Sequence, residues 1–405
     1  MDDLLGFVGI FLVCLITLIV GMRWPGVSKI LFVALTLRIF TLLIGNYAIT
    51  LPDSTADASS IENHARIIAE NGFFNLLDYY PGPSFAFIRW LIAIPYSLFG
   101  PSELMAKSMS LFFGMGSVFL GWKLACKLWD SQVATKVGWV IALFPSLILY
   151  SSLTMRSVYI CFFLLVAIYG VVNWAQTKKF SSICLALIGF ISATFFHGAS
   201  IIGAFTFIAI LTLISFKDFF ELLKRFHLSS KNLFLISLFV GVILFYFSNE
   251  INVPYLNDFK FISDPDVLLR RTRVSVMGEA AYPDWTIAKY PIELIYKIPI
   301  RSIYFMFAPF PWDVKQVEHI VGMFDGFLFM YLVFLILSNI KFIWENFTLR
   351  IIFLILISYL IVFGTGVGNF GTGIRHRSKF AIIFILLAAP LLKNFILLKK
   401  IRKNK

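Results

Sequence analysis

Two short segments, far apart in the sequence, carry acidic and basic side chains of the kind that take part in catalysis. The first, residues 51–66, reads LPDSTADASSIENHAR and contains Asp53, Asp57, Glu62 and His64. A carboxylate can act as a general base that takes a proton from a hydroxyl group. Asp57 and Asp53 are therefore the candidate catalytic residues, and Glu62 and His64 are candidate contacts for a sugar or its acceptor.

These acidic residues also have structural explanations. Ser59 and Glu62 have the spacing of a capping box, which predicts a helix from Ser59 to a terminating glycine at Gly72. Asp57 would then precede the cap, and Asp53 would occupy a turn. The segment alone leaves both interpretations open.

Metal and cofactor binding have weak support. His64 suits a polar helix face better than a ligand set, and the spacing of Asp53, Asp57 and His64 is not diagnostic of a divalent metal, which is left open. The sequence has no Walker loop and no Rossmann glycine fingerprint. No definite cofactor is predicted.

The second segment, residues 366–379, reads GVGNFGTGIRHRSK and contains Arg375, His376 and Arg377. Glycines and an asparagine precede the basic residues, so backbone N–H groups could form an anion-binding nest beside the guanidinium groups. The three residues are candidate phosphate ligands. The structural alternative is that they extend toward lipid headgroups.

A third group of residues, between 270 and 313, could support the same anion site. Its candidate phosphate ligands are Arg270, Arg271, Arg273, Lys289 and Arg301, and its candidate sugar or acceptor contacts are Tyr282, Trp285 and Trp312. Arginine suits phosphate oxygens, and aromatic rings stack on sugars. The alternative is a solvated amphipathic loop with aromatic residues at the membrane interface.

Composition identifies the kind of scaffold that must position these residues. Of 405 residues, 59% are hydrophobic and only 14% charged, whereas a soluble domain carries about a quarter charged residues. This excludes a soluble globular enzyme and a disordered chain. The net charge of +13 is better explained by positive cytoplasmic loops and anionic lipids than by a nucleic-acid partner, which is not expected.

Hydropathy predicts an all-α, polytopic integral membrane protein that forms a single transmembrane domain over residues 1–405. About eleven segments are apolar enough for transmembrane helices, at 4–21, 27–50, 104–126, 136–153, 157–175, 181–196, 199–215, 232–248, 321–340, 349–366 and 379–398. The stretch from Pro83 to Gly100 is interrupted by Arg89 and Pro95, and is expected to be a juxtamembrane helix in the interface.

Short-loop charges predict the orientation. Most short basic loops fall on one side of an eleven-helix arrangement, which should be cytoplasmic, so the outer loops 51–103, 249–320 and 367–378 form the presumed active-site side. The expected location is the inner (cytoplasmic) membrane, with the site facing the periplasm or exterior. Arg375, Arg377 and Lys379 violate the charge rule, and a bound anion would explain the violation. Arg38, in the middle of the second helix, has no partner that the sequence identifies.

These features together suit a sugar linked through phosphate to a membrane-embedded polyprenol. Arginines would hold the phosphate, while a carboxylate would deprotonate the acceptor, which attacks the anomeric carbon from the opposite face. The sugar would be transferred with inversion.

The chain also resembles a known superfamily. The segments YPGPSF (80–85), LFGPSELMAK (98–107), LACKLW (124–129) and ALFPSLILYSS (142–152) resemble the GT-C membrane glycosyltransferases, particularly the protein mannosyltransferase and aminoarabinose transferase branch. The resemblance covers roughly residues 50–200. It implies an inverting enzyme that uses polyprenyl-phosphate sugars, with the catalytic acidic residue best matched by Asp57 and next by Asp53. Two departures are an extra first helix and Arg156 where an acidic residue is expected.

The predicted function is therefore a glycosyltransferase that moves a sugar from a polyprenyl (undecaprenyl) phosphate to a glycan, lipid or protein acceptor, in cell-surface glycan or lipopolysaccharide assembly. One alternative is an O-antigen-type polymerase or ligase that acts on undecaprenyl-diphosphate-linked glycans and would not need Asp57. Another is a flippase or transporter of lipid-linked sugars. Membrane lipids are expected partners in each case.

Overall fold

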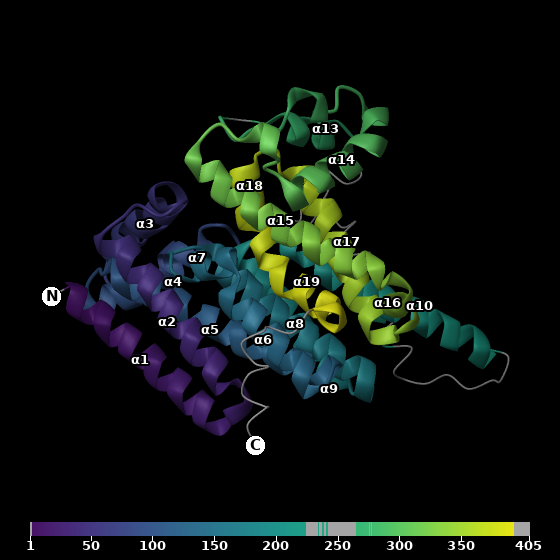
Figure 1. Cartoon of the computed structure of the whole chain (residues 1–405), viewed down its shortest axis with the longest axis horizontal. Helices are drawn as coiled ribbons and strands as arrows, with labels where there is room; N and C mark the ends of the chain where they lie inside the picture. The colour runs from purple at the N-terminus through teal and green to yellow at the C-terminus, as the bar shows by residue number, and fades with distance from the viewer. Residues whose placement is uncertain are drawn as a thin grey trace, which may run out of the picture.

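A computed structural model of the chain describes residues 2–223, 265–274 and 278–392, together with a few single positions between them. Figure 1 shows a helical molecule, and in this described part the only β-structure is one isolated bridge between Ala281 and Asn369. The predicted all-α fold is confirmed for these residues.

Six helices are long and apolar enough to cross a membrane. They are α1 (Asp2–Arg23), α2 (Pro25–Tyr47), α5 (Glu103–Leu128), α8 (Arg156–Thr177), α10 (Ile202–Leu223) with the short turn before it, and α17 (Phe347–Gly366). A seventh span is added if α6 (Ser131–Leu143) and α7 (Pro145–Ser151) are counted as one bent helix. The chain is thus suited to be a multi-pass α-helical membrane protein.

The predicted total of about eleven spans is not confirmed. Apart from single positions, segment 232–248 lies outside the described residues, and segment 379–398 is described only to residue 392. Two further apolar helices, α9 (Phe180–Phe196) and the apolar part of α15 (Val317–Ser338), are shorter than the roughly 20 residues that cross the hydrocarbon.

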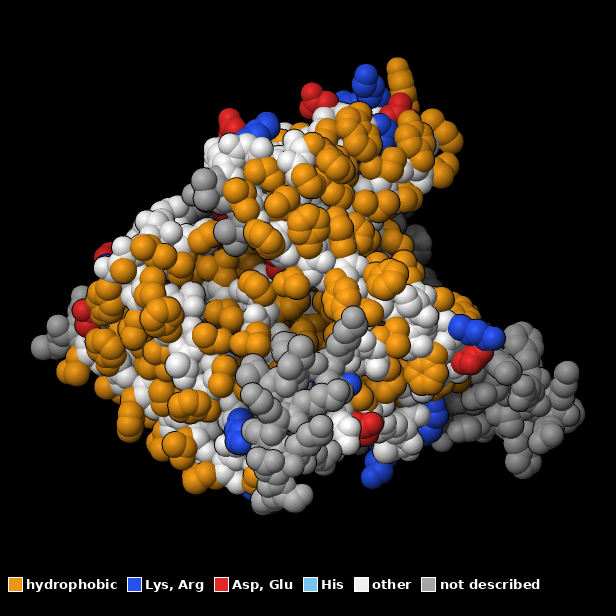
Figure 2. All heavy atoms as spheres, in the orientation of Figure 1, with side chains coloured by type: hydrophobic (Ala, Val, Ile, Leu, Met, Phe, Trp, Pro, Cys, Tyr) orange, Lys and Arg blue, Asp and Glu red, His pale blue; other side chains and the backbone are white. Residues whose placement is uncertain are grey.

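The molecular surface fits a lipid environment. Figure 2 shows hydrophobic side chains over most of the visible face, with lysine, arginine and acidic side chains gathered toward its upper and lower ends. Helix α1 contributes strongly exposed apolar residues such as Leu4 and Phe11. Side chains of this type lose nothing by facing acyl chains, so their exposure needs no protein partner.

Small residues bring α8 and α9 into backbone contact. A Cβ atom added at Gly170 would lie 2.4 Å from the backbone nitrogen of Ala186, and one added at Gly189 would lie 2.4 Å from that of Ala167. Close packing of this kind replaces the hydrophobic driving force that helices lack in lipid. Helix α8, whose first residue is Arg156, is thereby packed tightly against α9.

The predicted span 136–153 is not one straight helix. It divides into α6 and α7, which meet at a 58° bend. Pro145 begins α7 and has no N–H to donate to the carbonyl group of Ile141. Instead, the buried guanidinium group of Arg38 donates to the carbonyl oxygens of Ile141 and Ala142, at 3.4 and 3.1 Å. The bent helix is the partner of Arg38 that the sequence did not reveal.

The remaining elements lie outside the six or seven candidate spans. They include the π-helical turn η1 (Ser54–Ala58), α3 (Ser59–Ala69), η2 (Phe73–Tyr79), α4 (Phe87–Phe99), η3 (Gly198–Ile201), α13 (Pro265–Val274), α14 (Leu294–Phe307), α16 (Ile340–Glu345), α18 (Phe370–Arg377), η8 (Ser378–Phe380) and α19 (Ala381–Ala388), with 3-10 turns η5 (Asp284–Thr286), η6 (Pro291–Glu293), η7 (Pro311–Asp313) and η9 (Ala389–Leu391). In Figure 1, α3, α18 and α13 lie toward the upper edge of the molecule. Helix α4 falls within the predicted interfacial stretch.

Helix α3 begins at Ser59 as predicted, but the predicted capping box is wrong. The helix continues directly from η1, so its first N–H groups need no side-chain cap. The Ser59 hydroxyl donates to the carbonyl oxygen of Ser54 at 2.9 Å, and Glu62 turns toward Arg66. Gly72 follows the helix with φ +82°, a conformation that favours glycine.

Candidate functional site

The two segments that carry the predicted chemistry meet in the structure. Asp57, in η1, forms an ion pair with Arg375, in α18, although 318 residues separate them. The end of α7 completes the junction, where a small apolar cluster supports the pair. That cluster consists of Ala58, Tyr150, Leu153 and Met155, with Leu51, Leu149 and Ile374 packed against it.

Asp53 is held separately from Asp57. Its backbone has φ +64°, which few residues other than glycine, asparagine and aspartate adopt. The Tyr150 hydroxyl donates to Oδ2 of Asp53 at 2.8 Å. The two aspartates thus differ in their partners, because Asp53 has a neutral phenol and Asp57 has a guanidinium group.

The Asp57–Arg375 pair is accessible. The side chain of Asp57 is 41% exposed and that of Arg375 is 18% exposed. A ligand can therefore reach both groups without unfolding either segment, as a catalytic base and an anion-binding residue require.

A buried basic pair lies beside Arg375. Nζ of Lys379 is hydrogen-bonded to Nδ1 of His376 at 2.6 Å, and both residues are buried. The ring of His376 lies 5.0 Å from that of His197, and the Lys379 ammonium lies 5.0 Å from the ring of Phe363. Within the described residues no carboxylate pairs with Lys379.

Burial changes the electrostatics of this pair. Burial, followed by the nearby charges of Arg156 and Arg375, holds the pKa of Lys379 well below its ordinary value. Burial, followed by Lys379, lowers the pKa of His376 well below its ordinary range. An anion placed beside this pair would favour the charged form of each group, so the surroundings suit an anion.

The glycine-rich run before Arg375 does not form the predicted anion-binding nest, because the N–H groups of residues 370–373 already have acceptors. The Asn369 side chain caps α18 by accepting from the N–H groups of Gly371 and Thr372. The N–H of Phe370 donates to the carbonyl oxygen of Ala280, and that of Gly373 to that of Asn369. The segment is the start of a helix and not a loop.

Arg377, predicted as a phosphate ligand, has a structural environment. It is fully buried and its Nε donates to Oδ2 of Asp325 at 2.8 Å. Its remaining contacts are carbonyl oxygens of Ala308, Met306 and Gly322, at 2.6, 3.1 and 3.1 Å. Each of its three guanidinium nitrogens therefore already donates to a protein oxygen, which does not suit a phosphate ligand.

Arg301 departs from the predicted role for the same reason. It is fully buried and donates to the carbonyl oxygens of Val367, Thr365 and Thr272, at 2.8, 3.3 and 3.4 Å. It therefore joins α14 to the end of α17 and to α13. Burial lowers the pKa of Arg301 to about 10.

The other cations predicted in this region are not brought to the Asp57–Arg375 pair by any contact in the described part of the chain. Arg270, Arg273 and Lys289 are exposed, and Arg273 donates to the carbonyl oxygen of Lys289 at 3.2 Å. The side chain of Arg271 lies outside the described residues.

Two of the three predicted aromatic contacts, Trp285 and Trp312, are joined by a series of neighbouring rings. Trp285 and Trp312 are exposed, and the rings of Tyr304 and Phe310 lie between them, with centroid separations of 5.7, 5.2 and 5.0 Å along the series. Tyr282 differs because it is buried beneath α18, where a Cβ at Gly373 would lie 3.1 Å from its hydroxyl oxygen. It is not positioned to contact a sugar.

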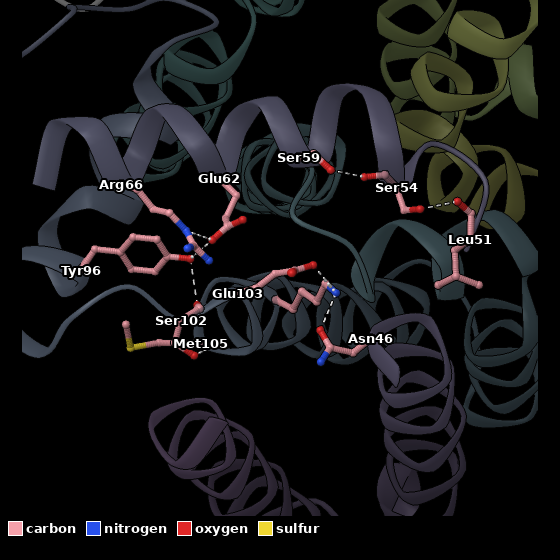
Figure 3. A network of polar contacts seen from close by, with 11 residues as sticks. Asn46, Leu51, Ser54, Ser59, Glu62, Arg66, Tyr96, Ser102, Glu103 and Met105 are labelled. Carbon is pink, nitrogen blue, oxygen red and sulfur yellow. Dashed lines mark hydrogen bonds and ion pairs between the residues drawn. The ribbon is translucent and has the colours of Figure 1, made fainter. Parts of the chain in front are cut away.

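Glu62 is part of an internal network, shown in Figure 3. Its Oε1 accepts from Nε of Arg66 at 2.6 Å and from the Tyr96 hydroxyl at 3.3 Å, and that hydroxyl also lies 2.8 Å from the carbonyl oxygen of Ser102. The network ties α3 to the start of α5. Burial and the charge of Glu62 raise the pKa of Tyr96. Glu62 is thus placed to hold the fold together and not to contact a sugar.

His64 lies on the exposed face of α3, where its Nδ1 is 2.7 Å from the carbonyl oxygen of Ser60. This is the polar helix-face position that its spacing suggested. In the described residues, no three His, Cys, Asp or Glu side chains come together in a group that could hold a metal ion.

Sequence reasoning left out Tyr150 and His197, and did not place Lys379 in the site. Lys379 was noted only as an unexpected outer charge. Its spacing from Arg375 would have placed it in the site, because two residues that are four positions apart lie on the same face of a helix. Tyr150 lies in a segment noted only for its family resemblance, and no local pattern links it to Asp53.

Fold and surface together define the class of protein as an α-helical, multi-pass membrane protein with a charged site outside its candidate spans. Comparison of the chain with protein-family models, with curated proteins and with solved structures gives no match. The function must therefore be argued from the site.

Proposed function

We propose that this protein is an inverting membrane glycosyltransferase of the GT-C type, which moves a sugar from a polyprenyl-phosphate donor to an acceptor outside the cytoplasm. The observation that carries the proposal is the direct contact between Asp57 and Arg375, with Lys379 buried beside them. It brings an accessible carboxylate, a guanidinium group and a lysine amine that can take up a proton to one place, in a molecule with a largely apolar surface.

Each group has a definite task in this reaction. Asp57 takes the proton of the acceptor hydroxyl while the acceptor oxygen forms a bond to the anomeric carbon. The bond between that carbon and the phosphate oxygen breaks, and its electron pair leaves with the polyprenyl phosphate. Arg375 and Lys379 stabilise the leaving phosphate, and Arg156 adds positive potential. No metal or nucleotide is needed in this scheme.

The proposal includes an outward-facing site in a cytoplasmic membrane and a role in cell-surface glycan assembly. The acceptor class stays open among glycan, lipid and protein. The exposed rings of Trp285 and Trp312, at the two ends of the aromatic series, offer stacking surfaces that suit a sugar-bearing acceptor. The polymerase alternative is less well supported, because Arg301 and Arg377 bind backbone carbonyl groups instead of facing a second phosphate.

The test uses the full chain reconstituted in vesicles with undecaprenyl-phosphate sugars labelled in the sugar. We expect labelled sugar to enter a covalent product while undecaprenyl phosphate is released. Asp57→Asn should reduce transfer by about 10²–10⁴-fold, the range for loss of a general base. Transfer that is undiminished in this variant would favour the polymerase or ligase, and movement across the bilayer without a covalent product would favour the transporter.

A further inference from the structure

Arg375 has two roles that compete for the same side chain. In this structure its Nη1 donates to Oδ2 of Asp57. In the proposed reaction the same guanidinium group binds the phosphate of the donor. A base that is held by a guanidinium group is poorly placed to accept a proton from an acceptor hydroxyl. The contact therefore restrains Asp57 until another anion takes its place.

We infer that binding of the donor phosphate releases Asp57 from Arg375, so that Asp57 becomes an active base only after the donor is bound. Arg375 is then a positioning residue as well as a phosphate ligand, and the donor binds before the acceptor can react. This inference rests on the proposed function and adds an order of events to it.

The physical cause is competition between two anions for one cation. Guanidinium groups bind phosphate through two parallel N–H donors. A phosphate bound to Arg375 in this way would accept the hydrogen bond that Arg375 now donates to Asp57. A phosphate at Arg375 also lies close to Asp57, and like charges at that separation repel. The exposed carboxylate is free to move, because its side chain is 41% exposed.

Lys379 provides the second anchor that makes the exchange favourable. It is buried, and it contacts the Nδ1 atom of His376 and the ring of Phe363. A phosphate that bridges Arg375 and Lys379 gains a cation that Asp57 does not contact in this structure. Among the residues that the structure describes, Asp57 pairs with Arg375 alone, so the phosphate is the stronger competitor.

Asp53 does not take part in this exchange. Its partner is the neutral hydroxyl of Tyr150, at 2.8 Å, which an incoming anion has little reason to displace. Its backbone is also fixed at φ +64° in the turn before η1. The two aspartates are thereby separated into a movable base, Asp57, and a fixed element of the turn, Asp53.

The exchange is reversible within one reaction cycle. After the proton moves from the acceptor to Asp57 and the polyprenyl phosphate departs, protonated Asp57 gives its proton to water. The ionised carboxylate then pairs again with Arg375. Without donor, a restrained base does not activate water or an acceptor near the site.

The experiment measures how reactive the Asp57 carboxylate is toward a carbodiimide and an amine, by peptide mass spectrometry of the full chain in lipid nanodiscs. The probe is farnesyl phosphate, a polyprenyl phosphate without a sugar. At saturating probe we expect labelling of Asp57 to rise about fivefold, the scale set by loss of a partly exposed ion pair. Glu103 is the internal control, because it is 52% exposed and paired with Lys107 at 2.6 Å, and its labelling should not change.

Two variants complete the test. In Arg375→Gln, Asp57 should be highly labelled without probe and should not respond to it. In Lys379→Met, binding of farnesyl phosphate should weaken, and Asp57 should stay protected. The titration of the unmodified chain with farnesyl phosphate tests the inference even if neither variant folds.

The possible failures are distinguishable. If the unmodified chain does not bind farnesyl phosphate, the proposed function is wrong. If it binds the probe in a Lys379-dependent way while labelling of Asp57 is constant, the release of Asp57 is wrong and the proposed function stands.

Discussion

Nη1 of Arg38 lies 3.1 Å from the carbonyl oxygen of Ala142, at the point where α6 ends and the chain bends by 58° into α7. The carbonyl oxygen of Arg38 in turn accepts from the hydroxyl of Ser152, just after α7. Because the last turn of α7 carries Tyr150, whose hydroxyl holds Asp53, this contact deep in the bundle fixes one side of the candidate site.

The first prediction concerns Arg38→Met. The variant removes the donor of the carbonyl groups of Ile141 and Ala142 at the bend, where no water is present to donate in place of Arg38. We expect the free energy of unfolding to fall by about 3 kcal/mol, given a cost of ~1–3 kcal/mol for each unsatisfied buried group. Denaturation of the purified full chain in detergent measures this.

Arg23→Met is the matched control, because Arg23 is exposed at the end of α1. It should change stability by less than about 1 kcal/mol. Equal unfolding midpoints for the two variants would show that Arg38 does not support the bend.

The second prediction separates Arg375 from Arg377, which are two residues apart. Arg377→Met leaves the carboxylate of Asp325 buried without its partner, and should reduce stability by roughly 3–5 kcal/mol. Arg375→Met removes a partly exposed pair and should cost no more than about 1 kcal/mol, while it strongly reduces transfer. Unfolding and transfer assays on both variants check this, and a loss of transfer in Arg377→Met without loss of stability would contradict it.

The geometry of a helix explains why these two arginines differ, and why the sequence did not separate them. Successive residues turn by about 100°, so Arg375 and Arg377 point to nearly opposite faces, whereas Arg375 and Lys379 share one. The segment looked like a glycine-rich loop, in which all three basic residues would be equivalent. Recognising Asn369 as a helix cap would have indicated the correct faces.

The apolar helices and both charged segments were predictable because hydropathy and unusual charge placement are local properties. The meeting of Asp57 with Arg375 was expected only from the requirement that both lie on the same side of a membrane. The partners of Arg38 and Asp53 were not predictable, since they arise from a bend at Pro145 and from tertiary packing that no local pattern encodes.

The third prediction addresses which aspartate is the base. Asp53→Asn keeps an oxygen that accepts from Tyr150, and asparagine tolerates positive φ well. We expect this variant to retain transfer within about threefold of the unmodified chain, far from the ~10²–10⁴-fold loss expected on removing a general base, as in Asp57→Asn. Initial rates of labelled-sugar transfer measure both variants. The opposite order of activities would make Asp53 the base.

The fourth prediction is a pH dependence of phosphate binding that depends on Lys379. Burial and the charges of Arg156 and Arg375 hold its pKa well below the ordinary value, so the amine is deprotonated at a pH where a free lysine is charged. A bound phosphate favours the ammonium form and raises that pKa. Binding therefore takes up a proton, and affinity should fall as pH rises through the window between the two pKa values, by up to about tenfold per pH unit.

Titration with farnesyl phosphate between about pH 7 and 10 avoids the phosphate's own second ionisation near pH 6. The other group that faces Lys379 closely, His376, adds little in this range because its pKa is lowered well below its ordinary value. Lys379→Arg keeps a permanent positive charge, so the variant should bind the probe with a nearly flat pH profile. An identical slope in the variant and the unmodified chain would assign the titration to another group and remove Lys379 from the phosphate site.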